Sequence, residues 1–229
     1  MEAKHANVLT SAQFRHLLRV TEATSRFPKR DTLILLLDVT CGMRVTEIAR
    51  VEAHHVLSRL GTRQKEITLP GRVTNGCRPR CVFLSHPRTI KAIDRYVEWR
   101  YSRGHGVGLD RSEYRGLMPC TRLIQTQKGS SFELSVKCRV SFAGEVMEYF
   151  SADSLQNYIT SLYRAAGLGR GDSSHSGRRT FAIRLVAQGH LLETLQILLG
   201  HSHLDHVAPF LDVSQRELHE AVAALNLSS

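Results

Sequence analysis

The chain has 229 residues and a mass of 25.7 kDa, and its 42% hydrophobic and 23% charged residues exclude a disordered chain and suit one large domain. Its 31 lysines and arginines outnumber 21 acidic residues, which gives a formal net charge of +10. The longest aliphatic run, residues 33–37, is too short to cross a bilayer, so a membrane-spanning protein is excluded as well.

The positive charge comes mainly from arginine. Of the 31 basic residues, 25 are arginine, whose planar guanidinium pairs with phosphate through two parallel hydrogen bonds. This favours a polyanionic partner, nucleic acid first, with a generic basic surface as the alternative.

The cysteines and the first residues indicate the compartment. Five cysteines, an odd number without a Cys-x-x-Cys pair, argue against a disulfide framework and a zinc ribbon. Residues 1–5 lack the apolar stretch of a secretory signal. We expect a cytoplasmic protein without a membrane partner.

The first third of the chain predicts three helices. Residues 10–13, Thr-Ser-Ala-Gln, form a capping box that opens the first helix, which Pro28 ends. A second, apolar helix covers about residues 31–40 and stops at the glycine that follows Cys41. A shorter helix covers about residues 45–51.

A β-hairpin and a helix follow. Residues 66–69 and 80–84 alternate as strands do, and they flank a turn around Asn75-Gly76. Residues 87–99 then predict a helix with an apolar face.

The second half is less regular. Residues 104–119 predict a loop, and residues 132–136 and 144–147 predict short strands. Asp153 opens a further capped helix, and three more helices begin near residues 177, 191 and 214. The fold class is therefore mainly α with a small antiparallel β-sheet (α+β).

Three segments carry the residues suited to chemistry. Arg44 follows the glycine turn and begins the run Arg-Val-Thr-Glu-Ile. His175 and Arg178 are three residues apart at a predicted helix start, so their side chains share a face near amides that favour an anion. Leu199-Gly200-His201 forms the third segment, and Phe210 follows nine residues after the histidine.

In these segments the sequence resembles the tyrosine recombinase/integrase family. Its signature has an arginine in a glycine turn before a Thr/Ser-Glu-Ile/Leu run, then His-x-x-Arg, then Leu-Gly-His. Arg44, His175, Arg178 and His201 match it in order, and the resemblance runs from about residue 9 to residue 213. The resemblance implies the fold of the family's catalytic domain.

Two positions depart from the family pattern. The family places its nucleophilic tyrosine nine residues after the histidine, where this chain has Phe210. The family also places a lysine in the hairpin turn, at a position that here corresponds to Asn75, with no lysine nearby. The acid that protonates the leaving group is thus unassigned, because arginine is a poor proton donor.

The family chemistry explains the residue types. Two arginines stabilise the charge that develops on the phosphate oxygens, a histidine donates a hydrogen bond or moves protons, and a tyrosine attacks. Bond energy is conserved in a 3′-phosphotyrosine, so the resemblance implies neither ATP nor any other cofactor. Phenylalanine keeps the ring but lacks the oxygen, so we expect the chain as given not to cleave DNA.

Further residues have supporting roles in this interpretation. Glu47 orients Arg44 or caps a helix rather than doing chemistry itself. DNA contacts are expected from four arginines, with solvation as the alternative for the last: Arg72, Arg78, Arg80 and Arg179. His201, His203, His206 and Asp205 suggest a metal, but no glutamate or cysteine completes a recognised set, so no metal is expected.

The resemblance also predicts the organisation of the chain. Residues 1–8 form a short tail, too short for the family's N-terminal clamping domain, and residues 9–213 form the catalytic domain. Residues 214–229 form a helix that packs on its own core or docks on a neighbouring subunit. The expected partners are duplex DNA recombination sites and further copies of the chain, which form a tetramer on the DNA. The two DNA sites are expected to exchange strands through a Holliday junction. The expected location is the cytoplasm, in association with the nucleoid, in a prokaryotic, phage or mobile-element context.

Three interpretations of function remain at this point. The first is a site-specific recombinase whose Phe210 is a Tyr→Phe change made to stall cleavage; the second is a naturally non-cleaving DNA-binding protein or regulator. The third is a helical nucleic-acid-binding protein with chance motif matches. Intact residues around Phe210 favour the first.

Overall fold

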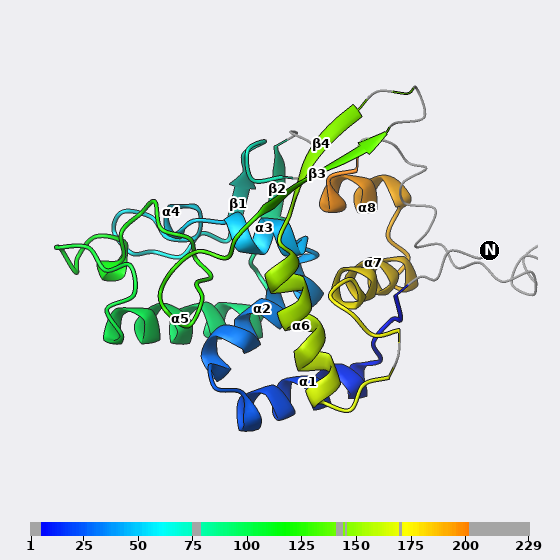
Figure 1. Ribbon diagram of the computed structural model, residues 1–229, viewed down its shortest axis with the longest axis horizontal. Coiled ribbons are helices and arrows are strands. Elements are labelled where there is room, and N and C mark those ends of the chain that lie inside the picture. Colours follow the sequence, from blue (N-terminus) through cyan, green and yellow to red (C-terminus); the bar gives the residue numbers. More distant parts are fainter. Residues whose placement is uncertain (1–5, 75–78, 141–143, 145, 170, 202–229) are drawn as a thin grey trace, which may run out of the picture.

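The computed structural model describes residues 6–74, 79–140, 144, 146–169 and 171–201 (Figure 1). Helices predominate in this part of the chain, joined by two β-hairpins. The elements are α1 (Ser11–Thr24), α2 (Pro28–Cys41), α3 (Val45–Arg50), α4 (Ala53–Val56), β1 (Glu66–Leu69), β2 (Arg80–Phe83), α5 (Pro87–Ser102), η1 (Tyr114–Gly116), β3 (Ser135–Val140), β4 (Val146–Ser151), α6 (Asp153–Ala165), α7 (Ser176–Ala187) and α8 (Leu192–Leu199).

The boundaries of α1 and α2 follow local signals. Thr10 Oγ1 accepts a hydrogen bond from Gln13 N at 3.2 Å, and Gln13 Oε1 accepts one from Thr10 N at 2.9 Å, which confirms the predicted capping box. Pro28 occupies the first turn of α2, so the helix begins three residues earlier than predicted. This start suits proline, because the first-turn amide has no partner inside a helix.

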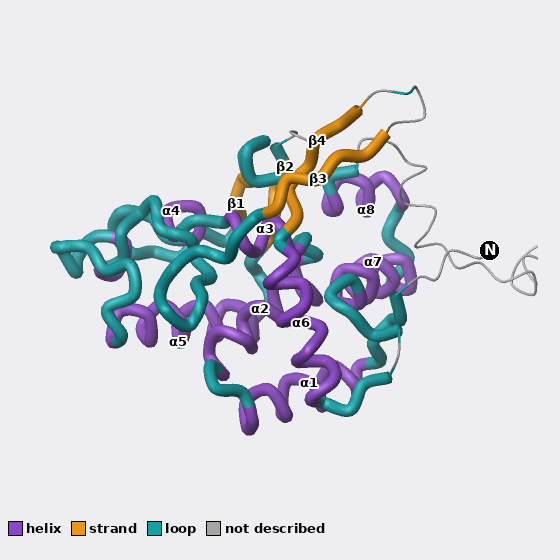
Figure 2. The backbone as a smooth tube through the Cα atoms, viewed as in Figure 1, coloured by secondary structure: helices purple, strands orange, loops and turns teal. Residues whose placement is uncertain are grey.

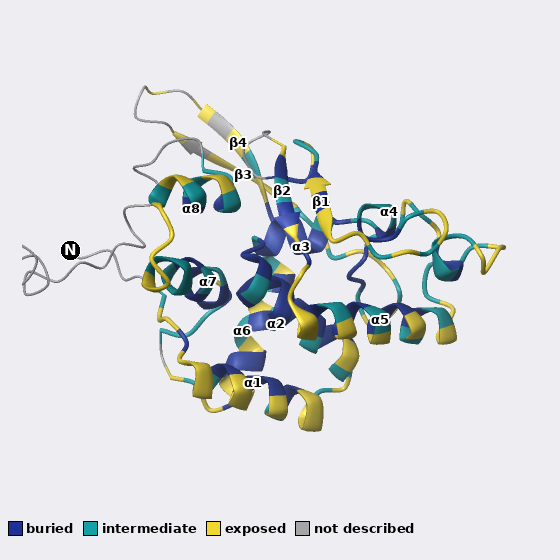
Figure 3. Ribbon diagram, turned by 180° about the vertical axis from the view of Figure 1, so that it is seen from behind, coloured by how far each residue is buried: buried dark blue, intermediate teal, exposed yellow. Residues whose placement is uncertain are grey.

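Helix α2 is the centre of the core. It contacts α1, α5 and α7, and its five-residue aliphatic run is at most 2% exposed at every position. Figure 3 shows α2 as a largely buried element with the more exposed helices around it. A helix buried on nearly every side explains why this run has no helical periodicity.

The structure has two separate hairpins where the sequence predicted one sheet (Figure 2). Strands β1 and β2 form the predicted antiparallel hairpin, and the structure places Glu66 opposite Phe83. The turn residues 75–78 lie outside the described part. Strands β3 and β4 form the second hairpin, with Ser135 opposite Ser151 and Val140 opposite Val146.

The predicted strand bounds in the second hairpin were wrong. Phe132 and Leu134 pack against the main core before β3 begins at Ser135, while Val140 and Val146 in the strands are each 69% exposed. The apolar residues of this hairpin point to solvent, so hydrophobic patterning placed the strands too early.

Asp153 also differs from its predicted role. It is the first residue of α6, not the residue that caps it, and Ala152 precedes the helix without a side-chain cap. Asp153 Oδ1 instead accepts hydrogen bonds from Lys137 Nζ at 2.7 Å and from Ser151 Oγ at 2.6 Å. The carboxylate therefore ties the second hairpin to the start of α6.

Helices α7 and α8 form a smaller apolar cluster around Ala182, Leu195 and Leu199. The residues before α1 attach to this region, since Asn7 N donates to Gly171 O and Leu9 N to Thr180 Oγ1, both at 2.9 Å. Within the described residues, no helix has the length and apolar character needed to span a bilayer. The helix predicted from residue 214 lies outside these residues.

Candidate active site

Glu47 organises the first predicted site segment. Its carboxylate, fully buried on α3, accepts hydrogen bonds from Arg44 N at 2.8 Å and Arg44 Nη1 at 2.9 Å. It also accepts two from Arg80 on β2, from Nε at 2.9 Å and from Nη2 at 2.6 Å. Burial alone would raise the pKa of Glu47, but the Arg80 charge and hydrogen bonds, with Arg178 and Arg44, lower it to about 2.

The glycine turn before Arg44 has a steric cause. Gly42 adopts φ +59°, and a Cβ there would lie 2.4 Å from Phe181 Cδ1 on α7. Only glycine combines that left-handed conformation with such close packing. The Gly42 carbonyl accepts hydrogen bonds from Arg80 Nη2 at 3.2 Å and from Arg178 Nη1, so the turn links the first and second segments.

The second and third segments meet at Arg178. Its Nη2 donates to Leu199 O at 2.6 Å and lies 3.1 Å from His201 Nε2. Gly200 ends α8 with φ +63°, and a Cβ there would lie 2.5 Å from Arg80 Cδ. The Leu-Gly-His motif thus places the Leu199 carbonyl and the His201 imidazole beside Arg178 of α7.

His175 stands at the start of α7. Its side chain is exposed, whereas Ser176 and Gly177 behind it are buried. Partial desolvation, followed by the charge of Arg178, lowers the pKa of His175 below its usual value. The imidazole is therefore neutral at neutral pH and is able to accept a proton.

Three of the motif residues border a pocket of about 1190 Å³. Arg44, His175 and Arg178 line it together with Lys137 and Tyr149 of the β3–β4 hairpin. Arg164 and Arg179 also line it, and a pocket of this volume with four arginines suits a phosphodiester backbone better than a small apolar ligand.

Asp38 borders the same pocket from α2. A Cβ on Gly177 would lie 1.9 Å from Asp38 Oδ2, so the carboxyl packs directly beneath the start of α7. Burial raises the pKa of Asp38 well above its usual value, and Arg178 only partly offsets that effect. The carboxyl is thus biased towards its neutral form.

The structure brings together Arg44, His175, Arg178, His201 and Glu47, as the motifs predicted. Arg80 is a correction: its side chain is 3% exposed, and its donors face Glu47, Gly42 and the Leu198 carbonyl. It holds the site together from within and cannot reach a DNA phosphate, contrary to the sequence prediction.

The other residues predicted to contact DNA lie in different parts of the structure. Arg179 is buried but lines the pocket, and Arg72 is exposed after β1, so both remain predictions. Asn75, Arg78 and the nucleophile position Phe210 lie outside the described residues.

Two pocket residues were missed by the sequence analysis. Lys137 and Tyr149 face each other across the β3–β4 ladder. No motif marks them; the only signal is that alternate residues of a hairpin share a face, and the misplaced strand bounds hid it.

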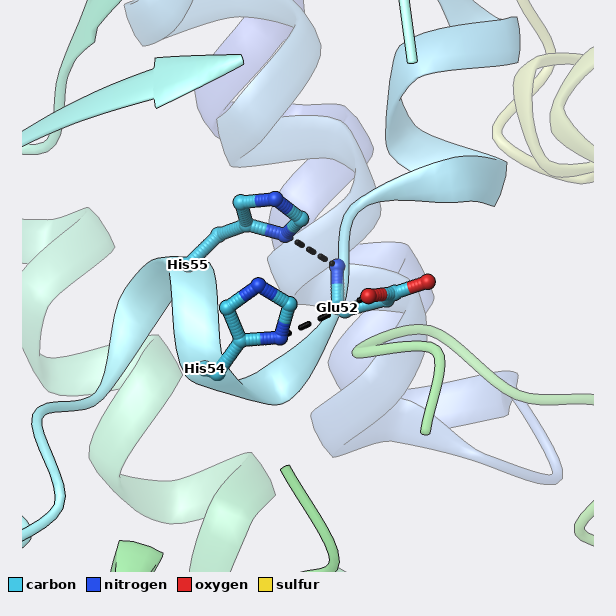
Figure 4. A group of neighbouring side chains, drawn as sticks. All are labelled: Glu52, His54 and His55. Atoms are coloured by element: carbon cyan, nitrogen blue, oxygen red, sulfur yellow. Dashed lines mark hydrogen bonds and ion pairs between the residues drawn. The ribbon is translucent and has the colours of Figure 1, made fainter. Parts of the chain in front are cut away.

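A separate cluster holds Glu52, His54 and His55, whose ligand-type atoms lie within 4.8 Å of one another (Figure 4). Each is already engaged: His55 Nδ1 accepts from Glu52 N at 3.0 Å, His54 Nδ1 donates to Pro119 O at 3.0 Å, and the Glu52 carboxylate pairs with Arg122. Desolvation, followed by the charge of His54, lowers the pKa of His55 to about 4. We interpret this cluster as packing around the short helix α4.

Comparisons with known proteins identify the family of the chain. The model of the phage integrase family matches residues 7–217. Tyrosine recombinase XerC of Caldanaerobacter subterraneus subsp. tengcongensis is 24% identical over 224 residues, covering 97% of this chain and 52% of the relative. Tyrosine recombinase XerD of Pseudomonas putida is 24% identical over 212 residues, covering 93% of this chain and 59% of the relative.

Solved structures share the fold. The XerA recombinase superposes with a TM-score of 0.65 at 16% identity, covering 96% of this chain and 65% of that one. The Tn1549 transposon integrase in complex with transposon right end DNA gives a TM-score of 0.64 at 18% identity, covering 98% of this chain and 67% of that one.

The chain spans between half and three-fifths of the length of the two curated relatives. The family match, by contrast, covers nearly all of this chain. Three motif residues, Arg44, His175 and Arg178, line one pocket, and His201 contacts Arg178. The chain therefore belongs to the phage integrase family, the tyrosine recombinases.

Proposed function

We propose that the chain acts in site-specific DNA recombination, in which integration, excision or inversion of a mobile element proceeds through a 3′-phosphotyrosine. The observation that carries the proposal is the pairing of Arg44 and Arg178 at one pocket, held by Glu47 and the Gly42 carbonyl. Two positioned guanidinium groups are what a phosphodiester needs as charge grows on its non-bridging oxygens.

Arg44 and Arg178 have different freedom to bind the phosphate. The Arg44 side chain donates to Glu47 through Nη1 and is 23% exposed, so its remaining donors face the pocket. Arg178 is held by the Gly42 and Leu199 carbonyls at its back. Both guanidinium groups are therefore fixed before the phosphate arrives, which reduces the reorganisation that the transition state requires.

The histidines complete the proton chemistry. The neutral His175 is suited to accept the proton of an attacking phenol. His201, beside Arg178, is suited to donate a hydrogen bond to a phosphate oxygen. No step needs a metal or a nucleotide, because the arginines supply the positive charge and the phosphotyrosine keeps the bond energy.

Phe210 decides the activity of the chain as given. It stands nine residues after His201, where the family has its nucleophile, and a phenyl ring has no oxygen to attack phosphorus. The chain is thus a cleavage-deficient, Tyr→Phe form of the enzyme. It still binds its DNA recombination sites as a tetramer, and it does so in the nucleoid. The second candidate, which Phe210 also favours, is a regulator that binds DNA and never cleaves it.

The test restores the nucleophile. DNA recovered with the protein from its native cell identifies the sites, and a duplex of that sequence with a nick near the cleavage position then serves as a suicide substrate. We expect Phe210→Tyr to form a covalent DNA adduct. No adduct on a verified site would favour the non-cleaving regulator.

A further inference from the structure

Lys137 is the lysine that lines the catalytic pocket among the described residues. We propose that Lys137 is a catalytic residue that protonates the leaving 5′ oxygen of the DNA strand. The proposal rests on the recombinase function proposed above, and it fills the role left open by the missing lysine of the β1–β2 turn.

The reaction needs a proton donor at this point. A 5′ alkoxide is strongly basic, about as basic as hydroxide, so it leaves poorly unless it is protonated. A guanidinium is a poor proton donor, so neither Arg44 nor Arg178 fills this role. His175 has a lowered pKa and is therefore mostly neutral, which suits a base and not an acid.

The position of Lys137 meets that need. It lies on β3 opposite Tyr149 of β4, and both side chains line the same pocket as Arg44, His175 and Arg178. In Figure 1 this hairpin extends from the start of α6, and Asp153, the first residue of that helix, anchors it. The lysine thus comes from a different hairpin than the family's lysine does.

Asp153 positions the side chain of Lys137 and keeps its amine protonated. Lys137 Nζ lies 2.7 Å from Asp153 Oδ1, and the same oxygen accepts the Ser151 hydroxyl at 2.6 Å. The hydrogen bond to Asp153 raises the pKa of Lys137, so its ammonium carries the proton at neutral pH. The side chain is 43% exposed, which leaves it free to turn from Asp153 to a bound strand.

The step balances in both directions. The phenol oxygen of the Phe210→Tyr protein forms a bond to phosphorus while its proton passes to His175. The bond from phosphorus to the 5′ oxygen breaks, its electron pair stays on that oxygen, and Lys137 Nζ transfers a proton to it. During rejoining the neutral amine takes the proton back from the attacking 5′ hydroxyl, and the phenol regains its own.

The other described lysines do not compete for this role. Lys29, Lys65, Lys91 and Lys128 are absent from the lining of the catalytic pocket. Lys128 is exposed in the loop before β3 and has no salt bridge among the described residues, so Lys128→Ala is a matched control for the loss of one positive charge.

The experiment compares two leaving groups in the Phe210→Tyr background. One suicide substrate has the normal 5′ oxygen at the cleaved bond, and the other has sulfur there. A thiol has a pKa of about 8.5, so a thiolate leaves without a proton. We expect Lys137→Ala to slow adduct formation about 100-fold or more on the oxygen substrate, the usual scale for loss of a general acid. The sulfur substrate should restore the rate to within a few-fold of the parent.

Two further variants sharpen the result. Lys137→Arg keeps the charge and the length but not a transferable proton, so it should bind DNA like the parent and remain slow on the oxygen substrate. Lys128→Ala should match the parent on both substrates. Thermal unfolding of Lys137→Ala should stay close to that of the parent, because an exposed ion pair contributes little to stability.

The possible outcomes separate this assignment from the proposed function. If Lys137→Ala is as fast as the parent on the oxygen substrate, or equally slow on both substrates, Lys137 is not the acid, and the recombinase function stands. If the Phe210→Tyr parent forms no adduct with either substrate on a verified site, the proposed function fails and this assignment fails with it.

Discussion

At the scale of single residues, Glu47 is the residue on which the site depends most. It is fully buried and faces the guanidinium groups of both Arg44 and Arg80. The sequence led us to expect that Glu47 orients Arg44 or caps a helix, and in the structure it contacts both the guanidinium and the backbone amide of Arg44. The sequence could not identify Arg80 as the second partner, because that contact joins residues 33 positions apart and depends on how the first hairpin packs.

Glu47→Gln tests this arrangement. Leaving Arg44 and Arg80 without their anion should lower the free energy of unfolding by about 3–5 kcal/mol at pH 7, the cost of breaking a buried ion pair. Denaturation with urea, followed by circular dichroism, measures the loss. A variant as stable as the parent would show that the carboxylate does not hold the arginines.

The same carboxylate predicts a pH dependence of stability. Its folded pKa of about 2 lies below the usual glutamate value of 4.5, so its contribution is present above about pH 4.5 and disappears as the pH falls towards about 2. The parent should lose stability in that window more steeply than Glu47→Gln does. Parallel stability curves of the two proteins between about pH 2 and pH 5 would contradict this prediction.

Arg178 should matter for the reaction more than for binding. In the Phe210→Tyr background, Arg178→Ala should slow cleavage about 100-fold or more, the scale for removing one charge-stabilising donor, while DNA affinity falls much less. Arg178→Lys should rescue poorly, because a lysine cannot hold the Gly42 and Leu199 carbonyls and the phosphate at once. Single-turnover cleavage and DNA titrations measure the two effects; a normal cleavage rate would remove Arg178 from the site.

At the scale of elements, helices were predictable where a capping residue, a proline or a glycine marks a helix end. Pro28 and Gly42 bound α2, and Thr10 caps α1. The second hairpin was misplaced because its apolar residues, such as Val140 and Val146, face solvent and give no core-facing pattern. Its two pocket residues, Lys137 and Tyr149, were missed for the same reason.

The turn between α2 and α3 provides a test at this scale. Gly42→Ala should destabilise the fold by about 1–3 kcal/mol through overpacking, because the new methyl group would meet Phe181 at 2.4 Å in a left-handed backbone. Gly104→Ala is the control, since Gly104 has a similar φ of +69° and a methyl group there would have no neighbouring atom within 4 Å. Equal losses of melting temperature in the two variants would show that packing against Phe181 is unimportant.

At the scale of the whole molecule, the fold class was predictable and the number of sheets was not. The two hairpins form separate two-stranded sheets, and local sequence patterning does not reveal whether two short strand pairs join into one sheet.

The net charge of +10 predicts that the whole molecule binds DNA through the phosphate backbone. Log affinity should fall linearly with log salt concentration, by a slope of about −0.9 for each phosphate neutralised. An affinity that does not change with salt would contradict a backbone-binding surface.

The C-terminal segment adds a prediction on assembly. Residues 214–229 begin with the capping box Ser-Gln-Arg-Glu and continue with an apolar stripe. If they dock on a neighbouring subunit, their deletion should abolish cooperative DNA binding while the melting temperature of the remaining domain changes little. Gel-shift titrations on a two-site duplex measure this, and undiminished cooperativity in the truncated protein would contradict the docking role.

The central claim is that this pocket cleaves DNA once a phenol oxygen stands at position 210. The decisive measurement is the yield of covalent protein–DNA adduct on a nicked suicide substrate, resolved on a denaturing gel, for the chain as given and for Phe210→Tyr. We predict an adduct with Phe210→Tyr and none with Phe210. An adduct formed by the Phe210 chain would contradict a nucleophile at position 210 and would point to Tyr149, the described tyrosine that lines the pocket, as the nucleophile.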